Sequence, residues 1–596
     1  MSLNLSSYPD LTQTLLKNRR ILTPEAAEKF LNPDYARDIY DPFLIMGMER
    51  AVLRILAAME ANEHIVVYGD YDCDGIPGSV VLHDFFKKIG YQNFQNYIPH
   101  RHNEGYGLNI TAVEKLATEG VTLMITVDCA ITDVAEVERA NELGMDVIIT
   151  DHHLPQEVLP KAYAILNSKQ KGDTYPDNML CGAGVAWKLA CALLSRGREK
   201  WNVPVGWEKW LLDMAGLSTI ADMVPLQNEN RVLAYYGLQV LRKSRRVGLR
   251  KLLQKMDMRQ ESIVEDDVGF MIGPRINAAS RMGNPLDAFR LLATEDDAEA
   301  DTLAEHLAHL NDTRKGLVAS MVKDARKHLD ARHIESAMRD VIVIGNPAWR
   351  PGLAGLVASN LVEAYARTVF VWGRTDDGRI KGSCRSDGTV NVVEMMTAVR
   401  KGVFVDVGGH ALSGGFSVET DAIHTLEDEL VSVYQNVRRE KEAEEQMIDA
   451  TLTLGEANWS TWKVVERFAP FGIGNPKPTF LFENIRVALV RRFGKENVHL
   501  ELTFENSAIK AIMFFTRLPP PKVTQADYKE TPSIPLVSSH STSVNLRAGF
   551  GGQVEKENLP ELISGDTIDL VATMELNMFR GKRELRLRIV SLSKKI

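Results

Sequence analysis

The chain of 596 residues is poor in cysteine and contains no long apolar run. Its five cysteines, at positions 73, 129, 181, 191 and 384, lack the spacing of a metal site. We therefore expect reduced thiols in a cytoplasmic protein. The absence of about 18 consecutive apolar residues argues against a membrane span. The first ten residues lack a basic segment followed by an apolar one, so no export signal is expected.

An excess of positive charge is also missing. The formal net charge is −9 and the pI is about 5.9, which is unusual for a protein that binds nucleic acid. The objection is weak if acidic side chains bind metal ions, because those ions offset the charge. Basic stretches at 242–246 and 580–588 offer only modest support, since such runs are more often solvated surface.

The length implies about three domains, and the patterns along the chain suggest their bounds. Strand-like and helix-like runs alternate from about residue 45 to 240, which predicts a mainly parallel sheet with helices on both faces. Short alternating strands after residue 450 are typical of a small β-barrel. The predicted segments are an N-terminal segment with a first α/β domain (1–284), a helical connector (285–336), a second α/β domain (337–425), a charged helical linker (426–449) and a barrel (450–596) with an inserted loop at about 518–550.

The first α/β region carries four clusters of acidic and histidine residues, each just after an apolar run. Short β-branched runs of this kind are typical of parallel strands, whose carboxyl ends gather the chemistry of an α/β sheet. Converging carboxylates repel one another unless divalent cations lie between them, so the pattern predicts a two-metal site for phosphoester hydrolysis. The clusters are Asp70-Tyr71-Asp72-Cys73-Asp74-Gly75, Asp128, Asp151-His152-His153 and Asp222.

The first cluster has three interpretations. An EF-hand calcium loop requires a bidentate Glu at its twelfth position, which is Val81 here. A purely structural acidic turn is the second, although three aspartates this close normally need a counter-charge. A metal-binding turn from strand to helix is favoured, because Asp72 and Asp74 can then face one ion while Gly75 relieves the backbone. A histidine pair is often without function, but four clusters together favour a metal site.

These clusters resemble the four ordered motifs of the DHH phosphoesterases. Further segments narrow the resemblance to the RecJ family of bacterial single-strand exonucleases, in the right order from about residue 10 to 596. The second α/β domain then resembles the DHH-associated domain, and the barrel resembles an OB-fold. The segments are Ile98–Arg101, Glu104–Gly107, Cys181–Gly184, Pro274–Ala279, Gly382–Ser386, Gly408–His410 and Pro470–Pro476.

The resemblance implies roles for particular residues. Two Mn²⁺ or Mg²⁺ ions are expected, with Asp128 as the bridging ligand, Asp70 at the edge of the site and His153 near the scissile phosphate. A plain surface position for each arginine, and a core position for the phenylalanine, remain alternatives. The implied metal ligands are Asp72, Asp74, Asp128, His152 and Asp222, the catalytic residues are Asp70, Asp128 and His153, and the substrate contacts are Arg275, Arg281, Arg385, Ser386, His410, Phe493 and Arg580.

A few positions depart from the family pattern without removing a predicted ligand. Ala130 stands where Gly is typical. Trp349-Arg350 stands where the family usually has Trp-His, so an arginine replaces the histidine. Ile76–Ser79 and Ser413–Gly415 also differ from the usual residues. These changes bear on substrate handling or rate.

The implied function is a 5′→3′ exonuclease of single-stranded DNA in DNA repair and recombination. Its expected setting is the cytoplasm, as a monomer that cooperates with a single-strand-binding protein and a helicase and has no membrane contact. One alternative is a phosphoesterase of short oligoribonucleotides or small nucleotides, whose members usually lack the barrel. Another is a non-catalytic replication scaffold, which would have no need for mutually repelling carboxylates.

Overall fold

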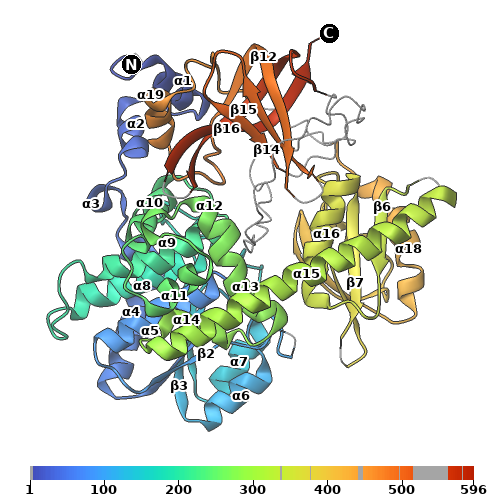
Figure 1. The fold of residues 1–596 in the computed structure, drawn as a ribbon. Coiled ribbons are helices and arrows are strands. Elements are labelled where there is room, and N and C mark those ends of the chain that lie inside the picture. Colours follow the sequence, from blue (N-terminus) through green and yellow to red (C-terminus); the bar gives the residue numbers. More distant parts are fainter. Residues whose placement is uncertain are drawn as a thin grey trace.

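The computed structural model describes residues 5–101, 103–335, 338–375, 377–440, 448–494, 497–514, 562–579 and 582–595. Figure 1 shows two α/β units side by side, with a β-barrel unit above them. The long helix α15 (Asp297–Glu335) runs from the first α/β unit to the second.

A fully parallel sheet forms the centre of the first α/β unit. Its strand order is β2-β1-β3-β4-β5, and every neighbouring pair is parallel. The central strands are almost wholly buried, as expected of a parallel sheet covered on both faces. The strands are β1 His64–Gly69, β2 Phe94–Tyr97, β3 Val121–Val127, β4 Asp146–Thr150 and β5 Ala164–Leu166.

Helices cover both faces of this sheet, as the alternation in the sequence predicts. One face packs against α4, α5 and α8 in the main core, and the other packs against α6 and α7 in a smaller core. The helices of the unit are α3 Tyr35–Asp38, η1 Pro42–Leu44, α4 Met48–Glu60, α5 Gly75–Lys88, α6 Ile110–Thr118, α7 Val134–Glu142, α8 Gly182–Gly197, η2 Trp207–Leu211, α9 Leu212–Ala221, α10 Asn228–Leu241, α11 Val247–Lys255, η3 Gln260–Ser262, α12 Glu265–Asp267, η4 Val268–Ile272, α13 Gly273–Met282 and α14 Leu286–Ala293.

Asp222 does not follow a strand, so the prediction that all four clusters lie at strand ends is wrong for this one. The preceding run is helix α9, and Asp222 is its C-terminal cap. Residues 212–220 are all buried. A helix buried on every side produces the same continuous apolar run as a buried strand, which is why periodicity could not separate the two.

The connector is helical, as predicted, and it contributes to two cores. Leu303 and Leu307 of α15 belong to the main core of the first unit. Met321 and Leu329, further along the same helix, pack in the second unit. The helix therefore holds the two units at a fixed separation.

A mixed sheet forms the second α/β unit, in the order β6-β7-β8-β10-β9, with only β6 and β7 parallel. Helix α18 places Leu426, Leu430 and Tyr434 in the core of this unit. It is therefore part of the unit, and not of the linker predicted for 426–449. The elements are β6 Val341–Gly345, α16 Pro351–Tyr365, β7 Thr368–Arg374, β8 Ile380–Arg385, α17 Val392–Ala398, β9 Phe404–His410, β10 Ser413–Val418, η5 Ala422–His424 and α18 Leu426–Val437.

Five strands close the predicted barrel in the order β12-β13-β14-β16-β15, and β15 pairs back onto β12. The short strand β11 lies parallel to β12 outside this ring. The loop predicted at about 518–550 lies outside the described residues. The elements are β11 Ala450–Thr451, α19 Trp459–Glu466, β12 Thr479–Phe493, β13 His499–Phe504, β14 Lys510–Met513, β15 Thr567–Phe579 and β16 Lys582–Lys594.

The N-terminal helices α1 (Asp10–Asn18) and α2 (Pro24–Leu31) belong to the barrel unit. Leu15 and Leu16 share one buried core with Phe468. The division that joined these residues to the first α/β domain is therefore wrong for them. Contacts between segments more than 400 residues apart leave no local pattern in the sequence.

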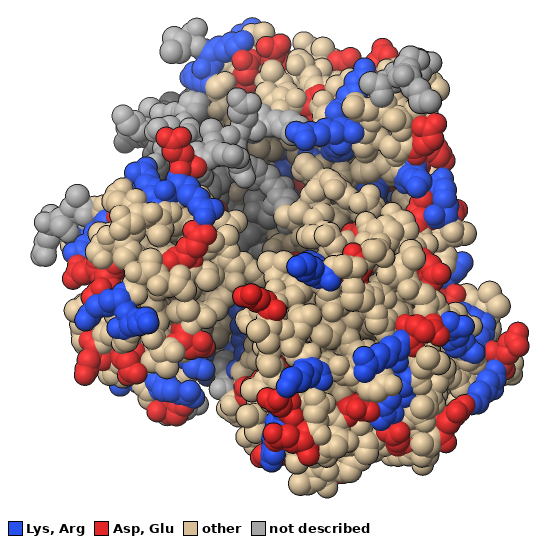
Figure 2. Space-filling model, turned by 180° about the vertical axis from the view of Figure 1, so that it is seen from behind, with Lys and Arg blue, Asp and Glu red and all other residues tan. Residues whose placement is uncertain are grey.

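One face of the molecule is mixed in charge. Figure 2 shows Lys and Arg side chains interspersed with Asp and Glu over both α/β units. Within the described ranges, no helix is both long enough and apolar enough to pass through a membrane. All five cysteines are free thiols.

Candidate active site

The first acidic cluster forms the turn between β1 and α5, at the carboxyl edge of the sheet. Asp72 fixes the start of the helix, since its Oδ1 accepts hydrogen bonds from the N–H groups of Asp74 and Gly75, at 2.8 and 3.2 Å. Gly75 is required because a Cβ there would lie 2.5 Å from the carbonyl oxygen of Asp70. The turn thus places three aspartates at one edge of the sheet.

The N-terminus of helix α8 holds Asp74 in place. The carboxylate accepts hydrogen bonds from the N–H groups of Gly182 and Ala183, at 2.6 and 2.8 Å. A helix N-terminus favours negative charge. Gly182 also allows Asp128 to approach, because a Cβ on it would lie 2.5 Å from the Cβ of Asp128. A larger residue would push these two carboxylates apart.

Asp128 follows β3 in a left-handed backbone conformation, with φ of +64°. Aspartate and asparagine adopt this conformation more readily than other non-glycine residues. Its N–H donates to the carbonyl oxygen of Thr150, at 2.9 Å, which ties it to β4. Ala130, two residues later, also has a positive φ of +85°. The methyl group that departs from the family pattern therefore lies on a backbone that favours glycine.

Asp151 is a buried residue that organises the histidine pair. Its Oδ1 accepts hydrogen bonds from the N–H groups of His152 and His153, at 2.7 and 3.0 Å, and lies 2.8 Å from Nδ1 of His153. Its Oδ2 accepts from the N–H of Ile131, at 3.0 Å. Burial alone would lower the pKa of His153, but the bond to Asp151 and its charge outweigh burial and raise that pKa. Asp151 therefore supports the histidines and does not face the cluster.

The predicted ligands converge on one place. Nε2 of His152 lies 3.1 Å from Oδ1 of Asp128, 3.6 Å from Oδ2 of Asp74 and 3.7 Å from Oδ2 of Asp222. Potential ligand atoms form overlapping groups whose members lie within 4.8 Å of one another. The groups are Asp70, Asp72 and Asp128; Asp74, His152 and Asp222; and Asp128, His152 and His153.

The chemistry of this cluster fits divalent cations. Oδ1 of Asp70, Oδ1 of Asp128 and Nδ1 of His152 are buried without a hydrogen-bond partner among the described residues. Burial and the neighbouring carboxylates raise the pKa of Asp74 to about 6 and that of Asp222 to about 9. Burial lowers the pKa of His152 to about 3, so its imidazole is neutral and can offer a lone pair. Carboxylate oxygens and a neutral imidazole suit Mn²⁺ or Mg²⁺, which would relieve the repulsion.

Three residues that the sequence patterns did not assign support the histidine pair. Lys169 Nζ donates to the carbonyl oxygen of His152, and Asn167 donates to that of His153, at 2.9 Å. The hydroxyl of Tyr106 lies 3.1 Å from both the carbonyl oxygen of Asp128 and Nδ1 of His153. Asn167 directly follows β5. The rule of polar residues at strand ends would therefore have found it.

Four arginines gather beside the carboxylates. Burial and the charges of Arg101, Arg314 and Arg385 lower the pKa of Arg281 to about 9, although Asp72 opposes this. Burial also lowers the pKa of Arg385, with Arg101 adding to the effect. Cations that disfavour one another's charge make a site for an anion such as phosphate. Arg281 and Arg385 were predicted contacts, whereas Arg101 and Arg314 were not.

Arg281 also connects the two α/β units, while Arg275 has a different environment. Arg281 Nη1 donates to the carbonyl oxygen of Gly352 at the start of α16, at 3.1 Å. Arg275 is buried, donates to the carbonyl oxygen of Met271 at 2.8 Å, and interacts electrostatically with Asp312 of α15. The structure does not bring Arg275 into the arginine group.

The second unit contributes His410, which ends β9 and stacks on His153. The two ring centroids are 6.4 Å apart and the rings are nearly parallel, at 7°. The hydroxyl of Ser386 donates to the carbonyl oxygen of Val390 at 2.7 Å and accepts from the N–H of Gly388 at 2.9 Å. Ser386 therefore shapes its own loop, and its contact with substrate stays a prediction.

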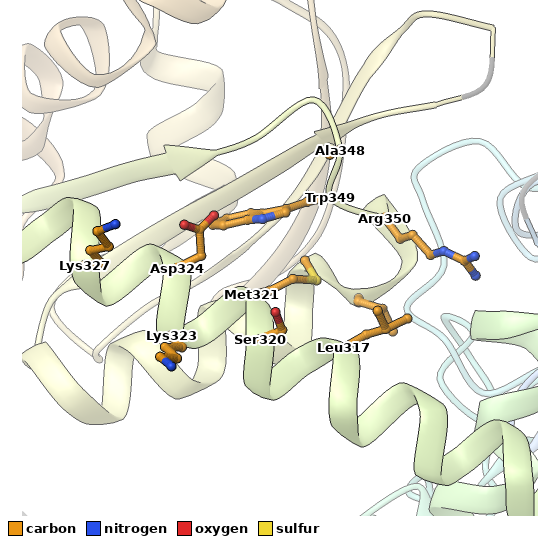
Figure 3. A pocket seen from close by; sticks show the side chains of 10 residues that line it. Leu317, Ser320, Met321, Lys323, Asp324, Lys327, Ala348, Trp349 and Arg350 are labelled. Carbon is orange, nitrogen blue, oxygen red and sulfur yellow. The ribbon is translucent and has the colours of Figure 1, made fainter.

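A cavity of about 590 Å³ lies between α15 and the loop before α16. Figure 3 shows Trp349 and Met321 lining it. Arg350 also lines the cavity, and the end of its side chain extends toward a loop of the first unit. The arginine that replaces the usual histidine thus adds positive charge where the two α/β units meet.

Phe493 belongs to an aromatic cluster on the barrel. Its ring centroid is 5.1 Å from that of His499 and 6.2 Å from that of Phe514. All three rings are half-buried. Arginines lie over these rings, namely Arg491 over Phe493 at 5.7 Å, and Arg586 and Arg588 over Phe514 at 5.8 and 4.4 Å. The other predicted barrel contact, Arg580, lies outside the described residues.

Three family models match successive parts of the chain. They describe the N-terminal domain of the DHH family over residues 64–217, the DHHA1 domain over 339–436 and the RecJ OB domain over 448–591. The second match includes most of α18, in line with the packing of that helix.

Curated relatives carry the name single-stranded-DNA-specific exonuclease RecJ. The protein of Bacillus subtilis is 37% identical over 501 residues, which are 84% of this chain and 62% of that relative. The protein of Haemophilus influenzae is 30% identical over 513 residues, 84% of this chain and 88% of the relative. The chain therefore spans less than two thirds of the Bacillus relative but most of the Haemophilus one.

A solved structure agrees in fold. The crystal structure of RecJ from Thermus thermophilus in complex with Mn²⁺ superposes with a TM-score of 0.75 and 25% identity, over 98% of this chain and 76% of that one. The prediction of a divalent metal cofactor is confirmed by the Mn²⁺ in this neighbour together with the acidic and histidine groups here, which are positioned to hold a metal ion. Sequence, domain order and fold agree: the chain belongs to the RecJ family of single-stranded-DNA-specific exonucleases.

Proposed function

We propose that this chain hydrolyses single-stranded DNA from its 5′ end with the help of two Mn²⁺ or Mg²⁺ ions. The observation that carries the proposal is the buried group of carboxylates around the neutral imidazole of His152, beside a group of arginines. The first group holds cations and the second holds phosphate, so the two together suit phosphodiester cleavage. The 5′→3′ direction rests on the family resemblance.

Each ligand has a task that follows from its surroundings. Asp72, Asp74, His152 and Asp222 would bind the ions, and Asp128 would bridge them because it has neighbours on both sides. Bound ions lower the pKa of a water molecule and stabilise charge on the attacked phosphate.

His153 is the residue best placed to contact the scissile phosphate. Asp151 raises its pKa, so its imidazole can donate a hydrogen bond to a phosphate oxygen. His410 from the second unit stacks on the same ring and encloses the site from the other side.

The arginines and the barrel would bind the rest of the strand. Arg281 and Arg385, with Arg101 and Arg314, offer charge to phosphate oxygens. The half-buried aromatic rings of the barrel offer faces on which bases can stack, which is how OB-folds bind single strands without reading sequence. This arrangement favours one strand over a duplex by shape.

Cellular context belongs to the same proposal. Repair and recombination generate 5′-ended strands that such an enzyme would trim in the cytoplasm. A helicase would supply unwound DNA, and a single-strand-binding protein would keep it single. The monomeric state stays a prediction, which light scattering of the purified chain would test.

The test is cleavage of single strands labelled at the 5′ or the 3′ end in the presence of Mn²⁺. Asp128→Asn is the matched control, because asparagine tolerates the left-handed backbone and keeps the shape of the side chain while removing its charge. We expect early loss of the 5′ label from single-stranded DNA only, absent in the variant and after chelation.

Other outcomes would favour the alternatives. Cleavage of RNA dinucleotides without cleavage of DNA would indicate a phosphoesterase of short oligonucleotides. Binding of single strands without cleavage, in all metals tried, would indicate a scaffold.

A further inference from the structure

The segment from Asp222 to Gln227, here the Asp222 loop, joins the proposed metal site to the barrel unit. It leaves the end of α9, which with α10 lies at the barrel-facing end of the first unit (Figure 1). Val224 packs in a small buried group with Cys181 and Ala183, at the helix end that holds Asp74. The loop therefore touches both the metal site and the support of another ligand.

The far end of the loop is held both by its own unit, where Leu226 packs in the main core and Gln227 caps helix α10, and by the barrel unit. The N–H of Leu226 donates to the carbonyl oxygen of Ile473 at 2.7 Å. Nε2 of Gln227 donates to the carbonyl oxygen of Gly474 at 2.9 Å. Both acceptors belong to residues 469–476, here the barrel loop.

Asn475 gives the barrel loop its shape. It is fully buried, and its Nδ2 donates to the carbonyl oxygens of Phe468 and Pro470, at 2.8 and 2.9 Å. Its Oδ1 accepts from Nε of Arg19, at 2.8 Å. Removing this amide would free the segment that presents the acceptors to the Asp222 loop.

Arg231 fixes the barrel loop against helix α10. Its buried guanidinium donates to the carbonyl oxygens of Phe30, Ala469 and Pro470, at 2.7, 3.0 and 3.3 Å. A buried cation that satisfies three carbonyl groups from the barrel unit makes a rigid joint. The position of the barrel loop relative to the first unit is therefore well defined.

We propose that the barrel loop is a positioning element for Asp222, so that docking of the barrel completes the metal site as well as holding DNA. Asp74 has two backbone N–H groups to orient its carboxylate. Asp222 is partly exposed, at 27% for its side chain, and follows a helix that ends at Ala221. Helix α9 holds its N–H, which donates to the carbonyl oxygen of Ser218 at 2.8 Å, and the loop that follows it ends on both α10 and the barrel loop. The inference rests on the proposed metal-dependent function.

The test is Mn²⁺ binding by titration calorimetry with the full-length chain, comparing Asn475→Ala with Lys477→Ala. Lys477 also joins the barrel unit to the first unit, but through Asp266, which lies outside the Asp222 loop. We expect Asn475→Ala to weaken binding at one ion by about tenfold, as for other residues that support metal ligands. Lys477→Ala should keep wild-type affinity. Binding of a labelled single strand without metal should be the same in both variants.

A second variant, Gln227→Ala, tests the same inference in case Asn475→Ala does not fold. Gln227 is exposed, and Gln227→Ala removes only the bond to Gly474, so the fold should persist and affinity for one ion should fall less than in Asn475→Ala. Excess Mn²⁺ should restore cleavage in both. Wild-type affinity in a folded Asn475→Ala, or an equal loss in Lys477→Ala, would overturn the inference. A wild-type chain that binds two ions but cleaves no DNA would overturn the proposed function alone.

Discussion

Buried charge in the first α/β unit is neutralised in some places, as around Arg246, but not at the proposed metal site. The guanidinium of Arg246 lies 2.7 Å from Asp84 and 2.7 Å from Asp213. Ser244 donates a further hydrogen bond to Asp213, at 2.8 Å. At the proposed metal site, by contrast, carboxylates such as Asp128 face one another and a neutral imidazole.

This difference indicates that cations are needed to neutralise the carboxylates of the proposed metal site. Buried ions persist in proteins when they are paired. Burial opposes the charge of Arg246, but Asp213 and Asp84 outweigh it and raise its pKa. At the metal site, burial and like charges raise the pKa of Asp70 and Asp128 well above the usual range. A group that the chain leaves unpaired in this way is a binding site for cations.

Among the predicted substitutions, Asp128→Asn should have the largest effect on cleavage, because it alters the proposed metal site directly. Loss of the bridging carboxylate should lower the rate of DNA cleavage by about a thousandfold or more. The metal-free variant should melt at a higher temperature than the wild type, because asparagine removes the cost of burying or protonating this carboxylate. Calorimetric melting with and without Mn²⁺ and a cleavage assay measure both.

The effect of Mn²⁺ on the melting temperature should also differ between the wild type and Asp128→Asn. Ions that bind only the folded state should raise the melting temperature of the wild type far more than that of Asp128→Asn. A variant that is less stable without metal would show that Asp128 is paired after all.

Asp213→Asn should have the opposite effects: it should lower stability and leave DNA cleavage unchanged. It leaves Arg246 with Asp84 as its only carboxylate, so the first unit should lose about 3 kcal/mol of stability, the low end for a broken buried pair. Cleavage per folded molecule should stay at the wild-type level. Thermal melting and a cleavage assay below the transition check this, and a loss of activity in fully folded protein would contradict it.

Arg385→Ala tests the positive partner of the metal site. Removing one of the proposed phosphate contacts should raise the KM for single-stranded DNA by about tenfold and reduce the salt dependence of binding by about one unit of slope. Arg379→Ala is the matched control, because Arg379 is an exposed residue of the same unit that pairs with Asp377. Equal effects of the two substitutions would exclude a specific phosphate site.

Much of the metal site was predictable, because the end of a buried parallel strand can be recognised in the sequence by the change from apolar to polar residues. The apolar run before the first acidic cluster is β1, and the aspartates follow it directly. Asp128 and the histidine pair follow β3 and β4 in the same way. A strand buried on both faces leaves a continuous apolar run, so the next polar residue marks the functional edge.

Features that depend on distant contacts were not predictable. Strands β9 and β10 each contain two adjacent glycines, which weaken the local strand signal, so their formation depends on pairing with each other. The burial of Arg275 depends on where α15 crosses it. Asp222 reaches the site from a helix whose end is set by the fold. The sequence marks residue types at local boundaries, whereas side-chain direction comes from tertiary packing.

Phe493→Ala should have the smallest effect and extends the comparison to the barrel, where arginines lie over aromatic rings as well as beside carboxylates. Loss of one stacking face is worth about 1 kcal/mol at the low end, so affinity for a single strand should fall about fivefold while kcat stays the same. Phe480→Leu is the control, because Phe480 is fully buried in the barrel core and offers no face to DNA. Anisotropy with a labelled strand measures affinity, and melting temperature reports stability. If Phe493→Ala lowers the melting temperature as Phe480→Leu does and leaves affinity unchanged, the ring belongs to the core and the strand follows another path.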